Sequence, residues 1–467
     1  MILPRLSELT SHFALVGGER KELPRLANSL ALILGRFASS GLGFLTWLVA
    51  ARLYAATEVG LASGLVSAMM LLVQFSLLGI GAAYITRYPA HQERPGRLLN
   101  TALTIVSAAA LLTSGVFILL SAWSFKELNV VAVQPAYGLL FSCMVLFGAL
   151  NSLMDSVSIA QRRSDQVLAR NVLFGVTAVA SIGILALLLP AHTSLMIVLG
   201  WTLAGLAACS LGAVQFWRAL SRYFFHPSLE KGIAAELIRN GLPNYLLTLS
   251  ERAPNWVLPI LVTELLSPAD NARWYTVWMM AWVVFQIPIS IGQNLFADIT
   301  RQPDKIDQSI AYSRRSSLIL GSLAAIGTML LAPFMLSLLG EEYAALGVLP
   351  LRILAFAVYP VIFIQSYYAV CRGTGRQREA TLTGLVSGLV STTSAAFVGL
   401  RYGIAGMAVA WLVTQLLAGI WAFWRTRTLT VLMRENWLAE TSRVIPGQDA
   451  GLDMPAPGLG SDEYITE

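Results

Sequence analysis

The chain has 467 residues, of which 56% are hydrophobic and only 12% are charged, and its formal net charge is +6. Soluble domains carry roughly a quarter charged residues, so this composition excludes a soluble enzyme and predicts an integral membrane protein. The three cysteines fall in apolar runs without paired spacing and the four histidines fall in predicted loops, which predicts neither a metal site, nor a histidine-based catalytic centre, nor a cofactor.

Twelve apolar windows follow one another along the chain, each about 20 residues long and therefore able to cross ~30 Å of hydrocarbon. They cover residues 28–50, 59–83, 99–122, 136–159, 167–189, 194–217, 241–265, 274–297, 315–339, 347–371, 380–400 and 404–424. The pattern predicts an all-α polytopic membrane protein with twelve transmembrane helices, six before and six after a polar stretch.

Basic residues lie mostly in the loops on one side of these windows. Only Arg52, Lys126, Arg273, Arg352 and Arg401 fall in loops on the other side. The positive-inside rule then predicts that both termini are cytoplasmic. Arginines close to window ends, such as those at 170 and 372, are assigned to the cytoplasmic surface on this basis. The outer loops are short and leave no room for an external catalytic domain.

The expected domains follow from these windows. They are a cytoplasmic N-terminal segment (1–27), an N-terminal six-helix bundle (28–217), a cytoplasmic linker (218–240), a C-terminal six-helix bundle (241–424) and a cytoplasmic tail (425–467) that is disordered after 446. Leu229, Ile233 and Leu237 recur every four residues among charged residues, which predicts a short amphipathic helix in the linker. A plain solvated linker is the alternative.

The two halves carry weakly matching stretches at equivalent places. Residues 51–64 follow the first window as 262–277 follow the seventh, and 158–169 close the fourth window as 369–382 close the tenth. An internal duplication with both copies in the same orientation would produce this pattern. We therefore expect two pseudo-symmetric bundles.

The seventh window is apolar enough to span a membrane, yet Glu251 and Arg252 lie near its middle. A charge there costs at least ~2.5 to 3.5 kcal/mol, so such residues normally face water or a partner. Thr248, Glu251 and Asn255 recur at helical spacing on one stripe. Prolines at 243, 254 and 259 predict a kink. We interpret this window as a helix that lines an aqueous lumen.

The stretches 51–88, 338–362 and 372–380 resemble the multidrug/oligosaccharidyl-lipid/polysaccharide (MOP) exporter superfamily, in particular its polysaccharide-biosynthesis branch of Wzx-like O-antigen flippases. The resemblance covers roughly residues 28–430. It implies a MATE-like fold in which two six-helix bundles surround a central cavity and alternate between inward-open and outward-open states.

The same resemblance implies the cargo and the location. A flippase of this branch moves an undecaprenyl-diphosphate-linked oligosaccharide, the repeat unit of a surface polysaccharide or exopolysaccharide, from the cytoplasmic to the periplasmic leaflet of the bacterial inner membrane. Expected partners are this lipid-linked sugar and membrane lipid, with a polysaccharide polymerase or export machinery as a further candidate. No nucleic-acid partner, catalytic residue or cofactor is expected.

Other functions are weighed against this one. A MATE-type drug or metabolite cation antiporter has the same fold, but the window 28–50 lacks the acidic residue that some antiporters carry there. Lipid II flippases carry two further helices after the twelfth, which this chain lacks. A membrane glycosyltransferase, polymerase or ligase needs a catalytic outer loop, and the longest one here offers only Lys126 and Glu127.

Arg36 in the first window and Arg252 in the seventh are the candidate cationic anchors. Guanidinium groups stay charged and pair phosphate oxygens through two parallel hydrogen bonds. We hypothesise that the two arginines face each other across the cavity and clamp the diphosphate. The alternatives are that Arg36 snorkels to the cytoplasmic surface and that Arg252 forms a structural ion pair with Glu251 or Asp155.

The remaining polar residues within windows complete the candidate site. Asp155 and Glu251 are candidates for coupling or gating: Asp155 would pair an arginine when the site is empty or take a proton or sodium ion, and helix packing is the alternative. Gln74 and Gln286, together with Asn255 and Thr248, are candidates for contacts to the sugar or headgroup. Trp278 and Trp282 share a stripe with Gln286 and would stack on sugar rings, packing again being the alternative.

Overall fold

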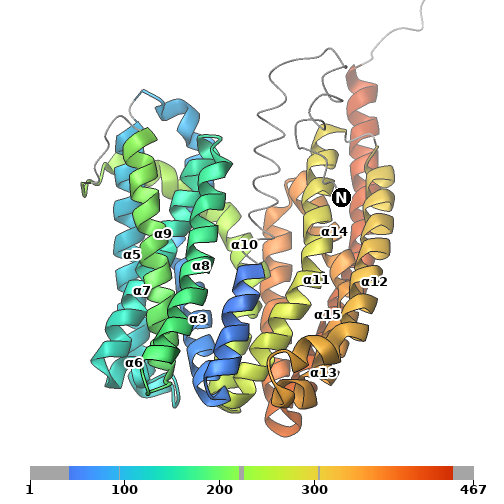
Figure 1. Ribbon diagram of the computed structural model, residues 1–467. Coiled ribbons are helices and arrows are strands. Elements are labelled where there is room, and N and C mark those ends of the chain that lie inside the picture. The colour runs from blue at the N-terminus through green and yellow to red at the C-terminus, as the bar shows by residue number, and fades with distance from the viewer. Residues whose placement is uncertain (1–40, 94, 220–225, 303–304, 445–467) are drawn as a thin grey trace, which may run out of the picture.

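The computed structural model describes residues 41–93, 95–219, 226–302 and 305–444 (Figure 1). Regular structure in these residues is helical throughout, without a strand. The N-terminal half comprises a short helix Gly41–Leu53 followed by α3 (Ala56–Leu77), α4 (Ile80–Arg87), the 3-10 helix η2 (Tyr88–His91), α5 (Pro95–Ser124), α6 (Val130–Val133), α7 (Pro135–Ala160), α8 (Ser164–Leu188) and α9 (Ser194–Ala219). The C-terminal half comprises α10 (Lys231–Leu265), α11 (Pro268–Arg301), α12 (Ile306–Ser337), α13 (Glu341–Phe356), α14 (Val358–Gly373) and α15 (Gln377–Val444).

Local chemistry sets several helix ends. Pro135 and Pro268 occupy the first helical positions of α7 and α11, where a missing N–H costs nothing. The Ser267 hydroxyl accepts the backbone N–H of Asp270 at 3.0 Å and caps α11. Within α15 the backbone breaks at Gly403, whose φ of 62° suits glycine because it has no side chain.

The predicted windows match described helices closely, although their number stays a prediction. Eight described helices are long and apolar enough to cross a membrane, and the bent pair α13 and α14 makes up to nine. One of the eight, α15, contains the last two predicted windows on either side of Gly403. The seventh window lies in α10, which is not one of the eight, and the first window is described only from Gly41 onward.

The predicted linker helix is the beginning of α10. Helix starts at Lys231 and continues without interruption through the predicted seventh window, in spite of its prolines. Ile233 and Leu237 are buried in the main core, and Glu236 forms an ion pair with Arg87 at 3.2 Å. The amphipathic pattern therefore reflects packing of α10 against the N-terminal half rather than a separate helix on a membrane surface.

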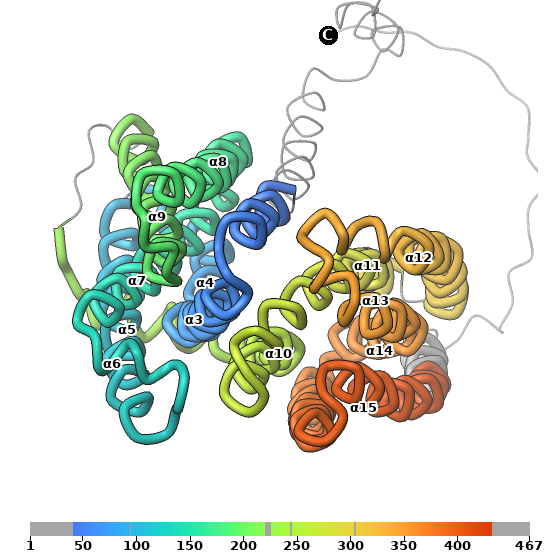
Figure 2. The backbone as a smooth tube through the Cα atoms, turned by 60° about the horizontal axis from the view of Figure 1, so that its bottom comes forward, coloured from blue at the N-terminus to red at the C-terminus, as the bar shows by residue number. Residues whose placement is uncertain are grey.

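The two halves lie side by side and meet along α3, α10 and α11 (Figures 1 and 2). Gly60 of α3 lies so close to the first turn of α11 that a Cβ atom there would be 1.5 Å from the Pro268 carbonyl oxygen. The Asn271 amide donates to the Gly60 carbonyl at 2.9 Å and to the Ser63 hydroxyl at 3.0 Å. These contacts need a glycine in α3, because any side chain would separate the halves.

Two further contacts join the halves at the same end of the molecule, which the distribution of basic residues assigns to the outer side. The Glu264 carboxylate accepts the backbone N–H groups of Lys126, Glu127 and Leu128 at 2.6, 3.2 and 2.7 Å. The Arg52 guanidinium donates to the carbonyl of Leu338 at 2.6 Å. We call these contacts, together with those of Asn271, the outer latch.

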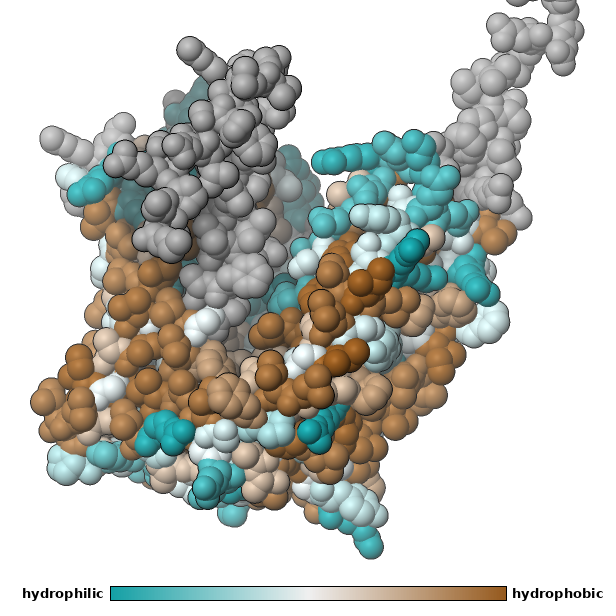
Figure 3. Space-filling view, turned by 45° about the vertical axis from the view of Figure 1, so that its right-hand side comes forward, coloured by the Kyte–Doolittle hydropathy of each residue, from teal (hydrophilic) through white to brown (hydrophobic). Residues whose placement is uncertain are grey.

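Apolar side chains cover the flank of the molecule between two hydrophilic ends (Figure 3). Exposed large hydrophobic residues are numerous on α5, α12 and α15, where they face away from the other helices. Helices surrounded by lipid expose such side chains because the bilayer, unlike water, solvates them. The surface therefore fits a protein embedded in a membrane.

Candidate functional site

A cavity of ≈ 490 Å³ lies inside the C-terminal half, between α10, α11, α14 and α15. Its wall on α10 is formed by the stripe that the sequence predicts to be wet, including Thr248, Glu251, Arg252 and Asn255. All of the residues that line it in the described part of the chain come from this one half. Four of the predicted site residues are thus brought together in one place.

The charged groups of the cavity are Glu251, Arg252 and Arg372. The Arg372 guanidinium on α14 donates to the Glu251 carboxylate on α10 and forms a partly buried ion pair with it. Arg252 lies at the cavity wall with an exposed side chain. Two guanidinium groups and one carboxylate leave a net charge of +1 on the lining.

Neutral polar side chains line much of the remaining wall. They are Thr248, Ser250, Asn255, Gln293, Gln365, Gln377, Ser387 and Gln415. Amide and hydroxyl groups both donate and accept hydrogen bonds, which matches the paired donor and acceptor character of sugar hydroxyls. The cavity therefore offers more hydrogen-bonding groups than a site for an apolar drug needs.

An aromatic cluster also lines the cavity. Trp278 stacks on Trp274 with ring centroids 5.5 Å apart and meets Trp411 edge to face at 5.0 Å. The Trp278 indole N–H donates to the Asn255 side-chain oxygen. Trp278 is only 4% exposed, so packing accounts for most of its surface, whereas the partly exposed Trp282 presents its ring to the cavity.

The other predicted headgroup contacts lie outside this lining. Gln74 is half-buried on α3 in the N-terminal half, and Gln286 is exposed on α11 next to a cavity-lining Phe285. Arg36 lies outside the described residues. The structure therefore places Arg252 at a cavity. The clamp between Arg252 and Arg36 remains a hypothesis.

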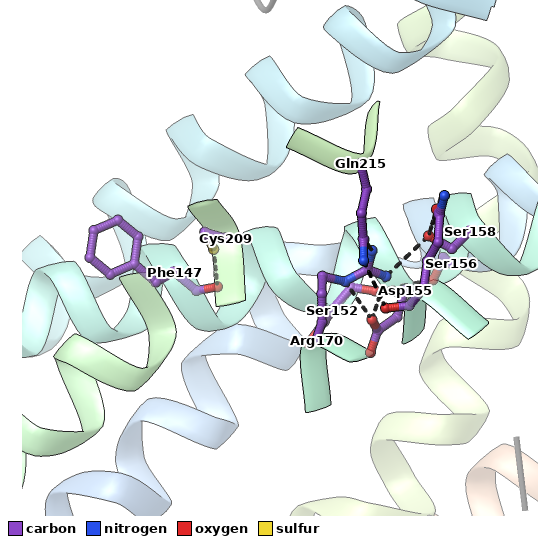
Figure 4. Close-up of polar contacts among 9 residues, drawn as sticks. Phe147, Ser152, Asp155, Ser156, Ser158, Arg170, Cys209 and Gln215 are labelled. Carbon is purple, nitrogen blue, oxygen red and sulfur yellow. Dashed lines mark hydrogen bonds and ion pairs between the residues drawn. The ribbon is translucent and has the colours of Figure 1, made fainter. Parts of the chain in front are cut away.

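Asp155 belongs to a separate polar cluster in the N-terminal half (Figure 4). Arg170 of α8, which is 0% exposed, donates to the Asp155 carboxylate at 2.7 Å, to the Ser158 hydroxyl at 3.1 Å and to the Gln215 side-chain oxygen on α9. The guanidinium thus links three helices. This geometry favours the helix-packing alternative for Asp155 and corrects the assignment of Arg170 to the cytoplasmic surface.

The C-terminal half has a comparable link between its last two membrane-crossing segments. Arg425 donates to both oxygens of the Glu379 carboxylate at 2.6 and 3.0 Å, and both residues belong to α15 on opposite sides of its break. Glu379 also accepts the Tyr367 hydroxyl at 3.3 Å. Each half therefore has an arginine–carboxylate pair that joins two of its membrane-crossing segments, which supports a structural role for both pairs.

Arg372 is the functional candidate that sequence reasoning missed. The positive-inside rule assigns it to the cytoplasmic surface, but it lies in the last turn of α14 and reaches Glu251. A usable signal was present: Gln365, Tyr368 and Arg372 lie three and four residues apart on one helical stripe, and all three line the cavity.

The arrangement suits binding rather than bond-breaking chemistry. Cationic groups with planar donors bind phosphate oxygens, amides bind hydroxyls, and aromatic faces bind the C–H faces of sugar rings. Within the described residues, three or more His, Cys, Asp or Glu side chains do not come together in a way that would hold a metal ion.

Comparison with known proteins identifies the fold. The family model described as polysaccharide biosynthesis protein matches residues 25–296, and no curated protein matches the chain.

Solved structures of low sequence identity share the architecture. A multidrug resistance MATE family transporter of the MOP superfamily in an inward-facing conformation is 14% identical, with a TM-score of 0.68 over 85% of this chain and 96% of that chain. The lipid II flippase MurJ in an inward closed conformation is 11% identical, with a TM-score of 0.68 over 89% of this chain and 92% of that chain. A MOP superfamily transporter from Pyrococcus furiosus is 15% identical, with a TM-score of 0.58 over 88% of this chain and 96% of that chain. The fold is that of MATE and MurJ transporters, and the protein is a multi-pass membrane protein.

Proposed function

The chain belongs to the polysaccharide biosynthesis protein family, and we propose on that basis that it is a flippase for an undecaprenyl-diphosphate-linked polysaccharide repeat unit. It would carry this cargo from the cytoplasmic to the periplasmic leaflet of the bacterial inner membrane. A protein of the same fold is a lipid II flippase, which supports a lipid-linked cargo.

The observation that carries this proposal is the composition of the C-terminal cavity. Arg252 and Arg372 outweigh the single carboxylate of Glu251, and amide side chains and the partly exposed Trp282 line the same cavity. A diphosphate needs cationic donors to replace its hydration, and the attached sugars need amides and aromatic faces. The cavity provides both within reach of one ligand.

The volume limits how much of the cargo fits. At ≈ 490 Å³ the cavity falls within the ~300 to 1,000 Å³ typical of sites for one small ligand. We propose that it holds the diphosphate and the adjoining sugar. The isoprenoid chain would then remain in the bilayer, and the distal sugars would extend into water.

The direction of loading follows from the two ends of the molecule. Arg372 at the end of α14 and Gln377 at the start of α15 belong to the lining, so the cavity reaches the end that the positive-inside rule assigns to the cytoplasm. The outer latch joins the halves at the opposite end. This arrangement supports entry of the cargo from the cytoplasmic side.

A cation antiporter is the second candidate, and Glu251 is the observation that favours it. A carboxylate among aromatic rings is a suitable site for an organic cation. Here, however, the carboxylate is already paired with Arg372, and the remaining charge of the lining is positive. The cavity therefore favours an anionic ligand.

A reconstituted system distinguishes the two candidates. Purified protein in vesicles would be tested for transfer of an undecaprenyl-diphosphate oligosaccharide across the bilayer and, separately, for uptake of an organic cation, each with and without a proton or sodium gradient. We expect transfer of the lipid-linked sugar. Uptake of the cation without transfer of any isoprenoid-linked sugar would overturn the proposal.

A further inference from the structure

A second hollow lies on the outside of the C-terminal half, between α14 and the last part of α15. It has a volume of ≈ 340 Å³, and its lining is apolar or aromatic: Tyr359, Pro360, Phe363, Leu416, Gly419, Ile420, Phe423 and Trp424. It shares no lining residue with the first cavity. At Gly419 the two helices approach so closely that a Cβ atom would lie 2.8 Å from the Pro360 Cβ atom. We call this hollow the outer groove.

Two arginines lie against the rings of the outer groove. The guanidinium carbon of Arg314 on α12 is 5.4 Å from the ring centroids of both Phe363 and Phe423. That of Arg427 on α15 is 4.3 Å from the Phe423 ring and 5.7 Å from the Trp424 ring. Two cations therefore share one aromatic ring, at one end of an apolar groove.

These two cations have no carboxylate partner in the part of the chain that the structure describes. Among the residues that the structure describes, neither Arg314 nor Arg427 forms an ion pair with a carboxylate. The Nε and Nη2 atoms of Arg314 are buried and have no hydrogen-bond partner within the described segments. Buried donors on a charged group are costly when unpaired, and two neighbouring cations repel each other. An anionic acceptor would remove both costs.

The position of the pair specifies the kind of anion. Arg314 lies two turns into α12, and Arg427 lies in the part of α15 beyond its last predicted window. Both belong to the end of the molecule that carries the basic residues, where the anionic lipids of the cytoplasmic leaflet place their headgroups. Basic pockets between transmembrane helices on this side bind such headgroups.

We propose that the outer groove binds an anionic phospholipid of the cytoplasmic leaflet. Its phosphate would accept hydrogen bonds from Arg314 and Arg427, and one acyl chain would lie along Phe363, Ile420 and Trp424. The groove is on a different face of α14 from the first cavity, so its occupant would be separate from the cargo. This resident lipid would contact Arg314 of α12 and Arg427 of α15, and would thereby hold α12 against α14 and α15. The proposal does not depend on the identity of the cargo.

Lipid retention and lipid-dependent stability test this proposal. The full-length protein would be purified and placed in nanodiscs of phosphatidylcholine, with or without phosphatidylglycerol, and bound lipid would be counted by native mass spectrometry. We expect phosphatidylglycerol to be retained and to raise the unfolding temperature. In the double variant Arg314→Gln/Arg427→Gln we expect retention to fall by about tenfold or more, together with loss of the stabilisation.

Two further variants make the result specific. Arg315→Gln removes the exposed neighbouring arginine and is the matched control, for which we expect retention as in the wild type. Ile420→Trp fills the groove from a side chain that is 57% exposed, and we expect loss of retention with both arginines in place. Equal retention in the double variant and the wild type would overturn the proposal. So would displacement of phosphatidylglycerol by equimolar undecaprenyl diphosphate, since the groove would then belong to the cargo.

Discussion

Arg252 and Arg372 share a cavity but differ in their surroundings. Arg372 is committed to the Glu251 carboxylate, whereas Arg252 has an exposed side chain at the wall. Both guanidinium groups belong to the lining of the cavity. We therefore expect Arg252 to contact the diphosphate from its exposed position on α10, and Arg372 to hold Glu251 in position.

Substitution of Arg252 tests this assignment. Arg252→Ala is expected to reduce transfer of the lipid-linked sugar by about 10- to 100-fold, because hydrogen bonds to charged groups contribute roughly 1.5 to 3 kcal/mol. Arg252→Lys is expected to recover part of the activity, since lysine keeps the charge but loses the planar pair of donors. Transfer would be measured in proteoliposomes at matched protein levels. Arg301→Ala, at an exposed arginine outside the cavity, is the control, and wild-type transfer by the Ala variant would refute the assignment.

Substitution of Glu251 has the opposite expected effect on binding. Glu251→Gln removes the only carboxylate from the described lining and releases the Arg372 guanidinium, so the net charge of the cavity rises from +1 to +2. We expect tighter binding of an isoprenoid diphosphate and slower turnover, because the cargo leaves less readily. Binding and transfer would be measured on the same preparation. Weaker binding would show that Glu251 contacts the cargo itself.

At the scale of the helices, buried polar links and close backbone contacts determine the packing. Arg170 is the sole charged side chain that is completely buried among the described residues, and it connects α7, α8 and α9. Without its guanidinium, the Asp155 carboxylate would remain partly buried beside α8 without a cation. Helix packing in this half therefore depends on one side chain.

Removal of that side chain is expected to destabilise the fold without a direct effect on the cargo cavity. We expect Arg170→Ala to lower the free energy of unfolding by about 3 kcal/mol, near the low end for breaking a buried pair because Asp155 retains some exposure. Thermal unfolding in detergent would be compared with that of Arg163→Ala, at an exposed arginine before the start of α8. Equal unfolding temperatures for the two variants would contradict a structural role.

Gly60 offers a second test at this scale. Gly60→Ala would place a methyl group within 1.5 Å of the Pro268 carbonyl, so α3 and α11 must move apart at the outer latch. We expect thiol reagents to reach a cysteine introduced at Ser63 more readily in this variant. Gly115→Ala on α5 is the control, because that position has no neighbouring atom within 4 Å and alanine favours the helix there. Unchanged labelling in Gly60→Ala would rule out this role of the glycine.

Apolar windows predicted the helices well because lipid-exposed helices must be long and apolar. The predicted fifth window, 167–189, corresponds to α8 (Ser164–Leu188). The same reasoning failed for Arg170 and Arg372, which lie near helix ends: charge at a helix end is equally consistent with a solvated loop and with an ion pair to another helix. The contacts with Asp155 and Glu251 depend on tertiary packing, which local patterns do not contain.

At the scale of the whole molecule, two halves of similar architecture carry different interiors. In the N-terminal half the Asp155 carboxylate is paired with an arginine between helices, whereas in the C-terminal half polar side chains such as Gln365 line a cavity. The outer latch joins the halves at the end opposite to the one that Arg372 and Gln377 of the cavity lining occupy. Under the proposed function, release of cargo to the outside would require the latch to open.

Crosslinking of the latch tests this requirement. Cysteines introduced at Ser63 and Asn271, in a variant without the three native cysteines, would be joined with a short, reducible thiol crosslinker. We expect transfer of the lipid-linked sugar to stop on crosslinking and to return on reduction, while the crosslinker leaves the transfer rate of either single-cysteine variant unchanged. Continued transfer in the crosslinked protein would exclude opening between α3 and α11.

Equilibrium binding of undecaprenyl diphosphate to the purified protein tests most directly whether the arginines of the C-terminal cavity hold the head of the cargo. The wild type would be compared with Arg252→Gln/Arg372→Gln and with a double variant of two exposed arginines outside the cavity, Arg163→Gln/Arg301→Gln. We expect the cavity variant to bind at least about 100-fold more weakly and the control to bind as the wild type does. Equal affinity in all three proteins would contradict the account.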